Sequence, residues 1–289
     1  FRQAGIEIIE ALKVSPLRML FRRLDLRQHR KIIVIDDNIA YTGSMNMVDP
    51  TKFKQDAGVG QWVDIMARVS GPASNVMGAI HAWDWEVETG HRELPTFPVC
   101  EINPDSIPHP IQVVPSGPGM PVNLIQQVLT LAINQAEHSV RITTPYFVPS
   151  DHLLQVLMMT AQRGVTVELI IPHDNDSFLV NWASKSFFSD LLAAGVQIYQ
   201  FKGGLLHTKS VVIDQSYSLI GTVNLDMRSL WLNFELTLVI QDKDFSARFY
   251  QLQQDYIAQS VRVRQQDWKA RGWYKKLLER LFYLFNPLL

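Results

Sequence analysis

Two strings in this chain carry the same polar residues at the same spacing. Residues 29–46 read HRKIIVIDDNIAYTGSMN, and residues 207–224 read HTKSVVIDQSYSLIGTVN, so the second copy begins 178 residues after the first. Identical spacing in two otherwise divergent strings indicates one structural unit that occurs twice. The shared polar residues are His29, Lys31, Asp36, Ser44 and Asn46 in the first copy and His207, Lys209, Asp214, Thr222 and Asn224 in the second.

These residue types suit chemistry on a phosphate. Lysine supplies a compact cation, while Asn and Ser/Thr donate hydrogen bonds to non-bridging oxygens. Histidine, with an ordinary pKa of ~6.5, acts as a nucleophile or a proton carrier near neutrality. If the two copies meet, one histidine attacks phosphorus and forms a phosphohistidine, and the other protonates the leaving oxygen and then activates the second acceptor. The lysines and asparagines would stabilise the charge on the equatorial oxygens in place of a metal.

Each string is predicted to form a β-hairpin. With Asp37-Asn38 as a two-residue turn, Lys31 lies opposite Ser44 and His29 opposite Asn46. The same register in the second copy sets Lys209 opposite Thr222 and His207 opposite Asn224. Alternate residues share a face, so each hairpin gathers its four polar groups on one patch. Asp36 and Asp214 fall at an odd offset from the histidines, which favours a structural role at the turn.

The composition limits what surrounds these strings. The 289 residues are 47% apolar and 19% charged, enough for a packed core and contrary to disorder. A formal net charge of −1 gives no overall field that attracts nucleic acid. The one cysteine, Cys100, excludes an internal disulfide framework. No run of eighteen apolar residues occurs, so no transmembrane helix is predicted within this sequence.

The second half alternates strands and helices. The runs SVRITTPYF, VTVELIIP and VQIYQF are strand-like, and SDHLLQVLMMTAQRG between the first two has helical spacing, a Ser150/Asp151 start and a Gly164 stop. This βαβ order predicts an α/β fold with a mostly parallel sheet flanked by helices. The opening FRQAGIEIIEA aligns with LLAAGVQIYQF, so the first half is expected to be the end of a related lobe that is truncated at its N-terminus.

Four parts are predicted along the chain. Residues 1–94 form the C-terminal part of the first lobe, and 122–267 form the second lobe. Residues 95–121 form a connector, because eight of the fifteen prolines lie between residues 89 and 121. Residues 268–289 form an amphipathic helix with five basic residues and one acidic residue. That helix either docks on the lobes or, as we favour, lies on an anionic membrane surface.

The doubled string resembles the paired HKD motifs of the phospholipase D superfamily. Longer stretches are similar to bacterial cardiolipin synthases, namely DLRQHRKIIVIDDNIAYTGSMNMVDP, TTPYFVPSDHLL, GGLLHTKSVVID and GTVNLDMRSLWLNFE. The resemblance implies two phospholipase-D-like α/β lobes that join two phosphatidylglycerols into cardiolipin and release glycerol, without metal or other cofactor. It implies a bacterial inner-membrane protein anchored by N-terminal helices that this sequence lacks. The catalytic residues that it implies are His29, Lys31, Asp36, His207, Lys209 and Asp214.

The resemblance also points to two acids inside apolar strands, Asp64 and Glu235. In the superfamily such a carboxylate accepts the proton on the far nitrogen of a catalytic histidine and fixes its tautomer. Asp64 lies seven residues farther from its motif than Glu235 does, so its alignment is weaker. The superfamily's frequent use of the N-terminal copy makes His29 the expected nucleophile.

Other readings stay open. A phospholipase D that uses water as acceptor keeps the same chemistry, a nuclease is disfavoured by the near-zero charge, and a non-catalytic phosphate-binding membrane module would need no second histidine. Phosphatidylglycerol and anionic membrane are the expected partners, nucleic acid is not, and the oligomeric state is left open. TTPYFVPS, SGPG (116–119) and Arg228 fit substrate contact or simple packing. The remaining histidines show no metal-ligand spacing.

Overall fold

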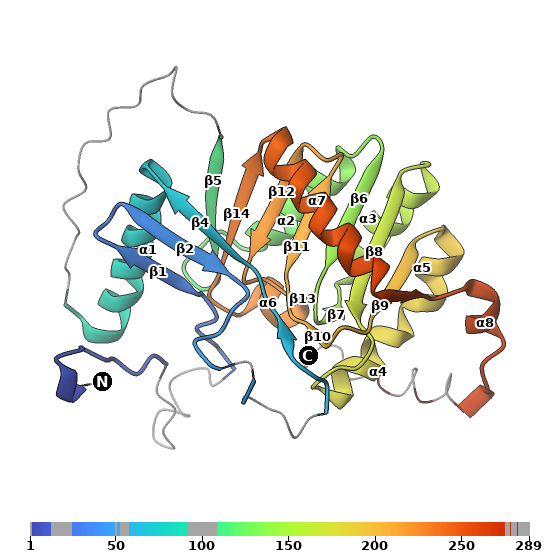
Figure 1. Cartoon of the computed structure of the whole chain (residues 1–289), viewed down its shortest axis with the longest axis horizontal. Helices are drawn as coiled ribbons and strands as arrows, with labels where there is room; N and C mark the ends of the chain where they lie inside the picture. The colour runs from blue at the N-terminus through green and yellow to red at the C-terminus, as the bar shows by residue number, and fades with distance from the viewer. Residues whose placement is uncertain are drawn as a thin grey trace.

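The chain folds around one long mixed sheet with a smaller sheet beside it (Figure 1). The computed structural model describes residues 2–12, 25–49, 51–52, 58–91 and 109–274, together with Leu278 and Phe282. The strands are β1 (Ile32–Ile35), β2 (Ile39–Gly43), β3 (Trp62–Val63), β4 (Met66–Ser70), β5 (Ile111–Ser116), β6 (Ser139–Thr143), β7 (Phe147–Val148), β8 (Thr166–Pro172), β9 (Gln197–Phe201), β10 (Leu205–Leu206), β11 (Ser210–Ile213), β12 (Tyr217–Gly221), β13 (Leu225–Asp226), β14 (Glu235–Gln241) and β15 (Ser260–Arg262). A 3₁₀ turn spans Arg2–Ala4, and the helices are α1 (Pro72–Thr89), α2 (Leu124–Asn134), α3 (Asp151–Gln162), α4 (Phe178–Ser186), α5 (Phe188–Ala194), α6 (Met227–Trp231), α7 (Lys243–Ala258) and α8 (Gln265–Lys269).

The long sheet has eight strands in the order β15-β9-β8-β6-β11-β12-β14-β5. Strands β6, β8 and β9 run parallel, whereas every other neighbouring pair in this sheet is antiparallel. The α/β class is therefore confirmed, but the expectation of a mostly parallel sheet is wrong. Only β6, β8 and β9 are joined by helical crossovers, and short connections turn β11, β12 and β14 back on one another.

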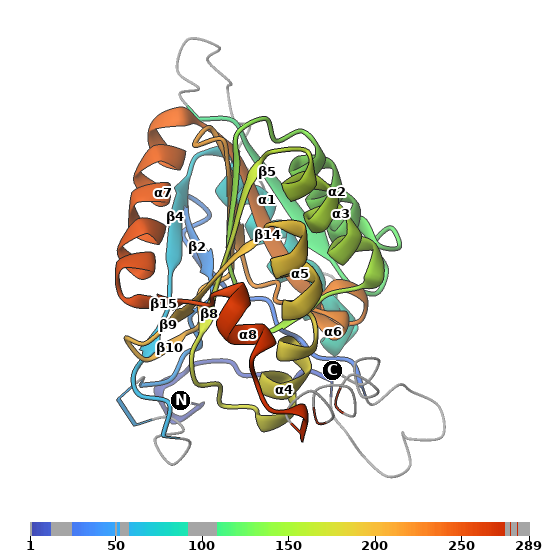
Figure 2. The same ribbon diagram turned by 90° about the vertical axis from the view of Figure 1, so that its right-hand side faces the viewer.

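Helices cover both faces of the long sheet (Figure 2). α2, α3 and α5 lie on one face over a core that includes Ile125, Leu153 and Val211, while α7 lies on the other. The predicted start of α3 is confirmed, because the Ser150 hydroxyl accepts a hydrogen bond from the backbone N–H of Leu153. The helix ends before Gly164, which adopts a positive φ of 99°.

The smaller sheet, β1-β2-β4, is antiparallel throughout. It repeats the β11-β12-β14 arrangement, and each hairpin carries one copy of the doubled string. A second core cluster joins the two sheets, since Ala40 and Val69 of the small sheet pack with Val212 and Ile220 of the long one. The two copies of the string thus belong to one packed body.

Two predicted segments differ in the structure. Residues 111–116, which the proline density placed in the connector, form β5 and pair with β14 along the edge of the long sheet. Pro115 sits in this edge strand, where a missing N–H is tolerated, and residues 92–108 of the same region lie outside the described residues. Most of the predicted helix 268–289 also lies outside them, although α8 ends at Lys269 and Trp268 packs against Phe188. None of the described helices is long and apolar enough to cross a bilayer.

Candidate active site

Both strings form the predicted hairpins, but their register differs by one residue from the prediction. Ile35 pairs with Ile39, and Ile213 pairs with Tyr217, so each turn contains three residues instead of two. The cause is that two consecutive residues in each turn adopt left-handed backbone conformations, with φ near 50° at Asp36 and Asp214 and 52° at their successors. Lys209 therefore lies across from Gly221, whose N–H bonds the Lys209 carbonyl, and not across from Thr222.

The shifted register gives the two hydroxyl residues a different task from the one predicted. Ser44 Oγ donates to Asp64 Oδ1 at 2.7 Å and accepts from the N–H of Ile65 at 2.9 Å. Thr222 Oγ1 likewise donates to Glu235 and accepts from the N–H of Leu236. The expectation that these hydroxyls donate to a phosphate is not supported, because each hydroxyl proton is already committed to a carboxylate.

A close backbone approach explains the glycine that precedes each hydroxyl residue. A Cβ on Gly43 would collide with the Ile65 carbonyl oxygen, and a Cβ on Gly221 would collide with that of Leu236. The glycines therefore let the acid-bearing strand segment lie against the hairpin. In each copy of the string, the glycine allows the close backbone approach and the following Ser or Thr hydroxyl bonds the carboxylate.

The two histidine–carboxylate pairs are crossed between the halves. His29 Nδ1 lies 2.8 Å from Glu235 Oε2, and His207 Nδ1 lies 2.6 Å from Asp64 Oδ1. Each acid follows one motif in the sequence yet binds the histidine of the other. The sequence singled out both acids but not this exchange. In both pairs the carboxylate occupies Nδ1, which leaves Nε2 for a substrate.

Backbone pairing enforces the exchange. The segment before His207, β10, runs parallel to β3, and the N–H of His207 donates to the carbonyl of Val63 at 2.9 Å. The segment before His29 makes the matching contact, in which its N–H donates to the carbonyl of Phe234 at 3.0 Å. Each histidine is thus fixed by main chain and side chain of the opposite half.

The ammonium group of each motif lysine lies on the backbone carbonyl of the histidine in the same motif. Lys31 Nζ donates to the His29 carbonyl at 2.9 Å, and Lys209 Nζ donates to the His207 carbonyl at 2.7 Å. Burial lowers the pKa of Lys31 to about 8, although Glu235 and Asp64 act in the opposite direction. Burial and the neighbouring Lys31 also lower the pKa of Lys209. Because each lysine interacts electrostatically with both Asp64 and Glu235, the two half-sites form one electrostatic unit.

His207 and Asp64 share a buried hydrogen bond. Burial, with the charges of Lys209 and Lys31, lowers the pKa of His207 to about 4 against the opposing effect of Asp64. Burial by itself would raise the pKa of Asp64, but the hydrogen bond and charge of His207, with Ser44 and Lys209, hold it below its usual range. At neutral pH the pair is a neutral imidazole beside a carboxylate.

The two aspartates of the HKD strings lie at the hairpin turns, as the odd offset predicted. Asp214 accepts hydrogen bonds from the backbone N–H groups of Glu137, His138 and Ser139 at 2.7–2.9 Å. Burial would raise its pKa, but these bonds lower it. Asp36 is exposed, and no partner for it is found in the described part of the chain. Both aspartates stand apart from the histidine pairs.

The motif asparagines differ in burial. Asn224 is buried, and its Oδ1 has no hydrogen-bond partner among the described residues, while Asn46 is half-buried. Asn224 leads directly into β13, which pairs with β7 of the TTPYFVPS stretch. Within that stretch Tyr146 Oη donates to Asp176 at 2.7 Å. The TTPYFVPS stretch therefore borders the second motif, but the hydroxyl of its Tyr146 is already hydrogen-bonded within the protein.

The remaining candidates are held by structural contacts. Arg228 Nη2 donates to the carbonyl of Asp25 at 2.6 Å. At the SGPG turn the Ser116 carbonyl accepts from Arg30, whose guanidinium also pairs with Asp84 and donates to the Glu235 carbonyl. Among the described residues, no three His, Cys, Asp or Glu side chains are grouped so as to hold a metal.

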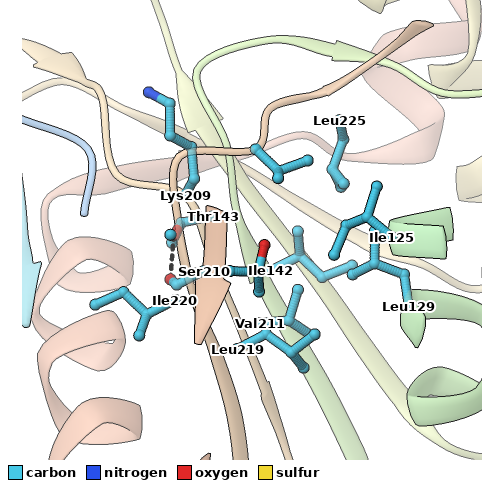
Figure 3. A pocket seen from close by; sticks show the side chains of 13 residues that line it. Ile125, Leu129, Ile142, Thr143, Lys209, Ser210, Val211, Leu219, Ile220 and Leu225 are labelled. Carbon is cyan, nitrogen blue, oxygen red and sulfur yellow. Dashed lines mark hydrogen bonds between the residues drawn. The ribbon is translucent and has the colours of Figure 1, made fainter. Parts of the chain in front are cut away.

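A small cavity lies between α2 and the sheet at the base of Lys209 (Figure 3). Its volume of about 20 Å³ is enough for a single water molecule. Figure 3 shows the Lys209 ammonium pointing away from the apolar side chains around it, such as Ile125 and Leu129. The cavity therefore belongs to the core, and the Lys209 ammonium lies outside it on the His207 carbonyl.

Comparison with known proteins gives consistent results. A family model described as "Cardiolipin synthase, PLD-like domain" matches residues 129–256. The chain is 58% identical over its whole length to cardiolipin synthase A of Edwardsiella ictaluri and to that of Yersinia pseudotuberculosis. It spans 60% of the length of each of these relatives. The fold resembles the crystal structure of phosphatidylserine synthase from Haemophilus influenzae, with a TM-score of 0.60 at 16% identity over 92% of this chain and 70% of that one.

Proposed function

We propose that this chain carries a PLD-like domain of the cardiolipin synthase family and catalyses the transfer of a phosphatidyl group from one phosphatidylglycerol to another, giving cardiolipin and glycerol. The observation that carries the proposal is the crossed arrangement of two histidines, each held at Nδ1 by a carboxylate of the other half. Two imidazoles that are held at Nδ1 and keep Nε2 for a substrate suit a nucleophile and a general acid.

The proposed reaction has two steps. One histidine attacks phosphorus, and the P–O bond to the glycerol head group breaks while the other histidine gives its proton to the leaving oxygen. The hydroxyl of a second phosphatidylglycerol then attacks the phosphohistidine and gives its proton to the second histidine, and the P–N bond breaks. Lys31 and Lys209 stabilise the charge on the non-bridging oxygens, and the asparagines Asn46 and Asn224 supply neutral donors.

The geometry gives the six HKD residues unequal parts in this proposal. His29, His207, Lys31 and Lys209 act on the phosphate, whereas Asp64 and Glu235 orient the histidines. Asp214 fixes its hairpin turn by accepting three backbone hydrogen bonds, and Asp36 is an exposed turn residue. Ser44 and Thr222 keep the two carboxylates in position, and act on the reaction only through them.

Hydrolysis is the second candidate, because water at the second step would give phosphatidic acid with the same residues. The similarity to cardiolipin synthase A over the full chain favours transfer. A net charge of −1 gives no support to a nuclease.

We also propose that the protein works at a membrane that contains phosphatidylglycerol, the bacterial inner membrane being the expected location. Helix α4 exposes two large apolar side chains, Phe178 and Leu179, and its Trp182 stacks on Phe282 near the C-terminus. The loop that leads into α4 contacts the strand exit beside the second motif, since Asn175 Nδ2 donates to the Pro145 carbonyl. Helix α4 contacts β7, which pairs with β13, and Figure 1 shows these elements and α6 in the lower part of the molecule.

The test is an assay with phosphatidylglycerol as the only lipid. Purified protein in detergent micelles is incubated with phosphatidylglycerol, and the products are identified by mass spectrometry. Cardiolipin and glycerol in equal amounts are expected. Phosphatidic acid as the main product would replace the proposed transfer with hydrolysis.

A further inference from the structure

The two half-sites carry different residues at the position two before the orienting acid. Trp62 stands two residues before Asp64, and Asn233 stands two residues before Glu235. The Trp62 ring packs on the imidazole of His207 with centroids 4.5 Å apart and belongs to an apolar cluster with Val59 and Leu205. In the other half Asn233 Nδ2 instead donates to Glu235 Oε1 at 3.1 Å.

His207 lies in a buried setting that carries positive charge. His207 faces one carboxylate, Asp64, and two ammonium groups, those of Lys209 and Lys31, and the side chain is only 4% exposed. The ammonium groups and the burial both disfavour an imidazolium at this position. His207 is therefore kept as a free base, which agrees with its pKa of about 4.

His29 lies in a more open setting than His207. Its Nδ1 pairs with the fully buried Glu235, and it also interacts with the buried carboxyl of Asp226. Thr222 and Asn233 fix the Glu235 carboxylate in place by hydrogen bonds. The His29 side chain is 25% exposed, so it can exchange protons with solvent or with a departing alcohol.

We propose that His207 is the nucleophile, that His29 is the general acid and base, and that Trp62 is a positioning residue that keeps water away from the phosphatidyl group on His207. This proposal rests on the proposed function and specifies it. The sequence analysis expected His29 to be the nucleophile, because the superfamily frequently uses the N-terminal copy. The structure-based assignment is the reverse. A buried imidazole under an aromatic ring suits a covalent intermediate that must be kept from water, and the more exposed imidazole suits proton exchange with the two alcohols.

The assignment balances over one cycle. The Nε2 lone pair of neutral His207 forms the P–N bond, and the P–O bond to the leaving glycerol breaks as its oxygen takes the proton of His29. In the second step an acceptor hydroxyl forms a new P–O bond, its proton returns to His29, and the electron pair of the P–N bond returns to His207. The indole of Trp62 covers one side of the phosphohistidine and displaces water from it, so the acceptor hydroxyl attacks from the open side.

An activated substrate separates the two histidines. Phosphatidyl-p-nitrophenol has a leaving group that departs without a proton, so only the nucleophile is needed for the first step. His29→Asn should release one equivalent of p-nitrophenol in a burst and retain the phosphatidyl group, while His207→Asn should release none. Peptide mapping of the wild-type protein after an alkaline quench, in which a phosphohistidine survives, should place the adduct on His207. An adduct on His29, or a burst from His207→Asn, overturns the assignment.

The mapping on wild-type protein does not depend on the folding of a variant, so it decides the assignment in every case. It also separates this inference from the proposed function. An adduct on His207 in a protein that turns phosphatidylglycerol only into phosphatidic acid would keep the assignment and reject the cardiolipin product.

The role of Trp62 is tested by a ratio of products, which is independent of how much protein is folded. Trp62→Asn copies the residue of the other half, and Trp62→Phe keeps an aromatic ring. Trp62→Asn should raise the ratio of phosphatidic acid to cardiolipin by about tenfold, and Trp62→Phe should change it by less than about twofold. An unchanged ratio in Trp62→Asn contradicts the proposed shielding.

Discussion

At the scale of single residues, the site is a set of hydrogen bonds that fix two imidazoles from the Nδ1 side. Glu235 and Asp64 hold His29 and His207 across the boundary between the halves, at 2.8 and 2.6 Å. Ser44 and Thr222 hold the carboxylates in turn. In the proposed reaction, the reactivity at Nε2 would therefore depend on groups that do not touch the substrate, as in other systems where a third residue orients a histidine.

Removing the charge of either orienting carboxylate should slow the reaction. Asp64→Asn and Glu235→Gln keep the size of the side chain but present an amide where the Nδ1–H needs an acceptor. We expect kcat to fall by roughly 10²–10⁴-fold with a much smaller change in KM. Steady-state kinetics on phosphatidylglycerol micelles measures both. A loss confined to KM would assign the acids to substrate binding instead.

The buried imidazole of His207 should make stability depend on pH. Its folded pKa of about 4 lies below the value of ~6.5 in an unfolded chain. The unfolded chain therefore binds more protons between these values, so stability decreases as the pH falls from about 6.5 to about 4 and is unaffected by this group above that range. The difference corresponds to about 3 kcal/mol.

Urea unfolding at several pH values measures this effect. His207→Gln removes the titrating group, and its free energy of unfolding should lose the corresponding part of the pH dependence. The titration of Asp226, whose pKa burial raises to about 6, occurs in both proteins and cancels in the comparison. An equal pH dependence in both proteins would show that His207 is not kept neutral by the fold.

At the scale of elements, the two hairpins and the acid-bearing strands that follow them build the site. The spacing of the doubled string was sufficient to predict both hairpins and the polar residues they carry. It could not give the register, because that depends on left-handed conformations at Asp36 and Asp214 that other residue pairs also adopt. The crossing of the carboxylates was likewise hidden, since it arises from parallel contacts between β3 and β10 that are distant in the sequence.

The same limit explains the two errors in the fold. Short antiparallel connections between β11, β12 and β14 were not weighed against the βαβ signal, so the sheet was expected to be mostly parallel. The strand β5 was hidden by proline density, although an edge strand tolerates proline where its N–H would face away from the sheet. Local pattern identified the elements, and tertiary pairing decided their order.

The hairpin turns offer a matched pair of variants. Asp214→Asn weakens three hydrogen bonds to backbone N–H groups, and we expect it to reduce the free energy of unfolding by about 1–2 kcal/mol while the kcat of the folded protein stays within about twofold. Asp36→Asn alters an exposed turn residue and serves as the control. Thermal unfolding and active-site-normalised rates measure both. A large fall in kcat without loss of stability would indicate that Asp214 takes part in the reaction.

At the scale of the whole molecule, the candidate site lies where strand segments from the two halves of the chain pair beside the long sheet. Helix α4, which contacts β7 in the lower part of the molecule in Figure 1, exposes Phe178 at 66% and Leu179 at 43%. Aromatic and aliphatic side chains of this kind insert at the membrane interface. This placement would present the histidines to phosphodiesters at the bilayer surface.

Polar substitutions on α4 should weaken membrane binding. Phe178→Ser with Leu179→Ser should lower binding to phosphatidylglycerol vesicles by at least about tenfold, because two apolar side chains no longer insert. Met159→Ser on α3 removes an equally exposed apolar side chain, 63% exposed, from another part of the surface and should have little effect. Vesicle sedimentation measures the binding, and equal losses in both variants would contradict a specific role for α4.

The steric course at phosphorus tests the two-histidine account most directly. Phosphatidylglycerol with a chiral phosphorothioate of known configuration is used as donor, unlabelled phosphatidylglycerol as acceptor, and ³¹P NMR identifies the configuration of the transferred phosphorus in the cardiolipin. Attack by a histidine followed by attack of the lipid hydroxyl inverts phosphorus twice, so the account predicts net retention. Net inversion would mean that the acceptor displaces glycerol directly, with no phosphohistidine, and would contradict it.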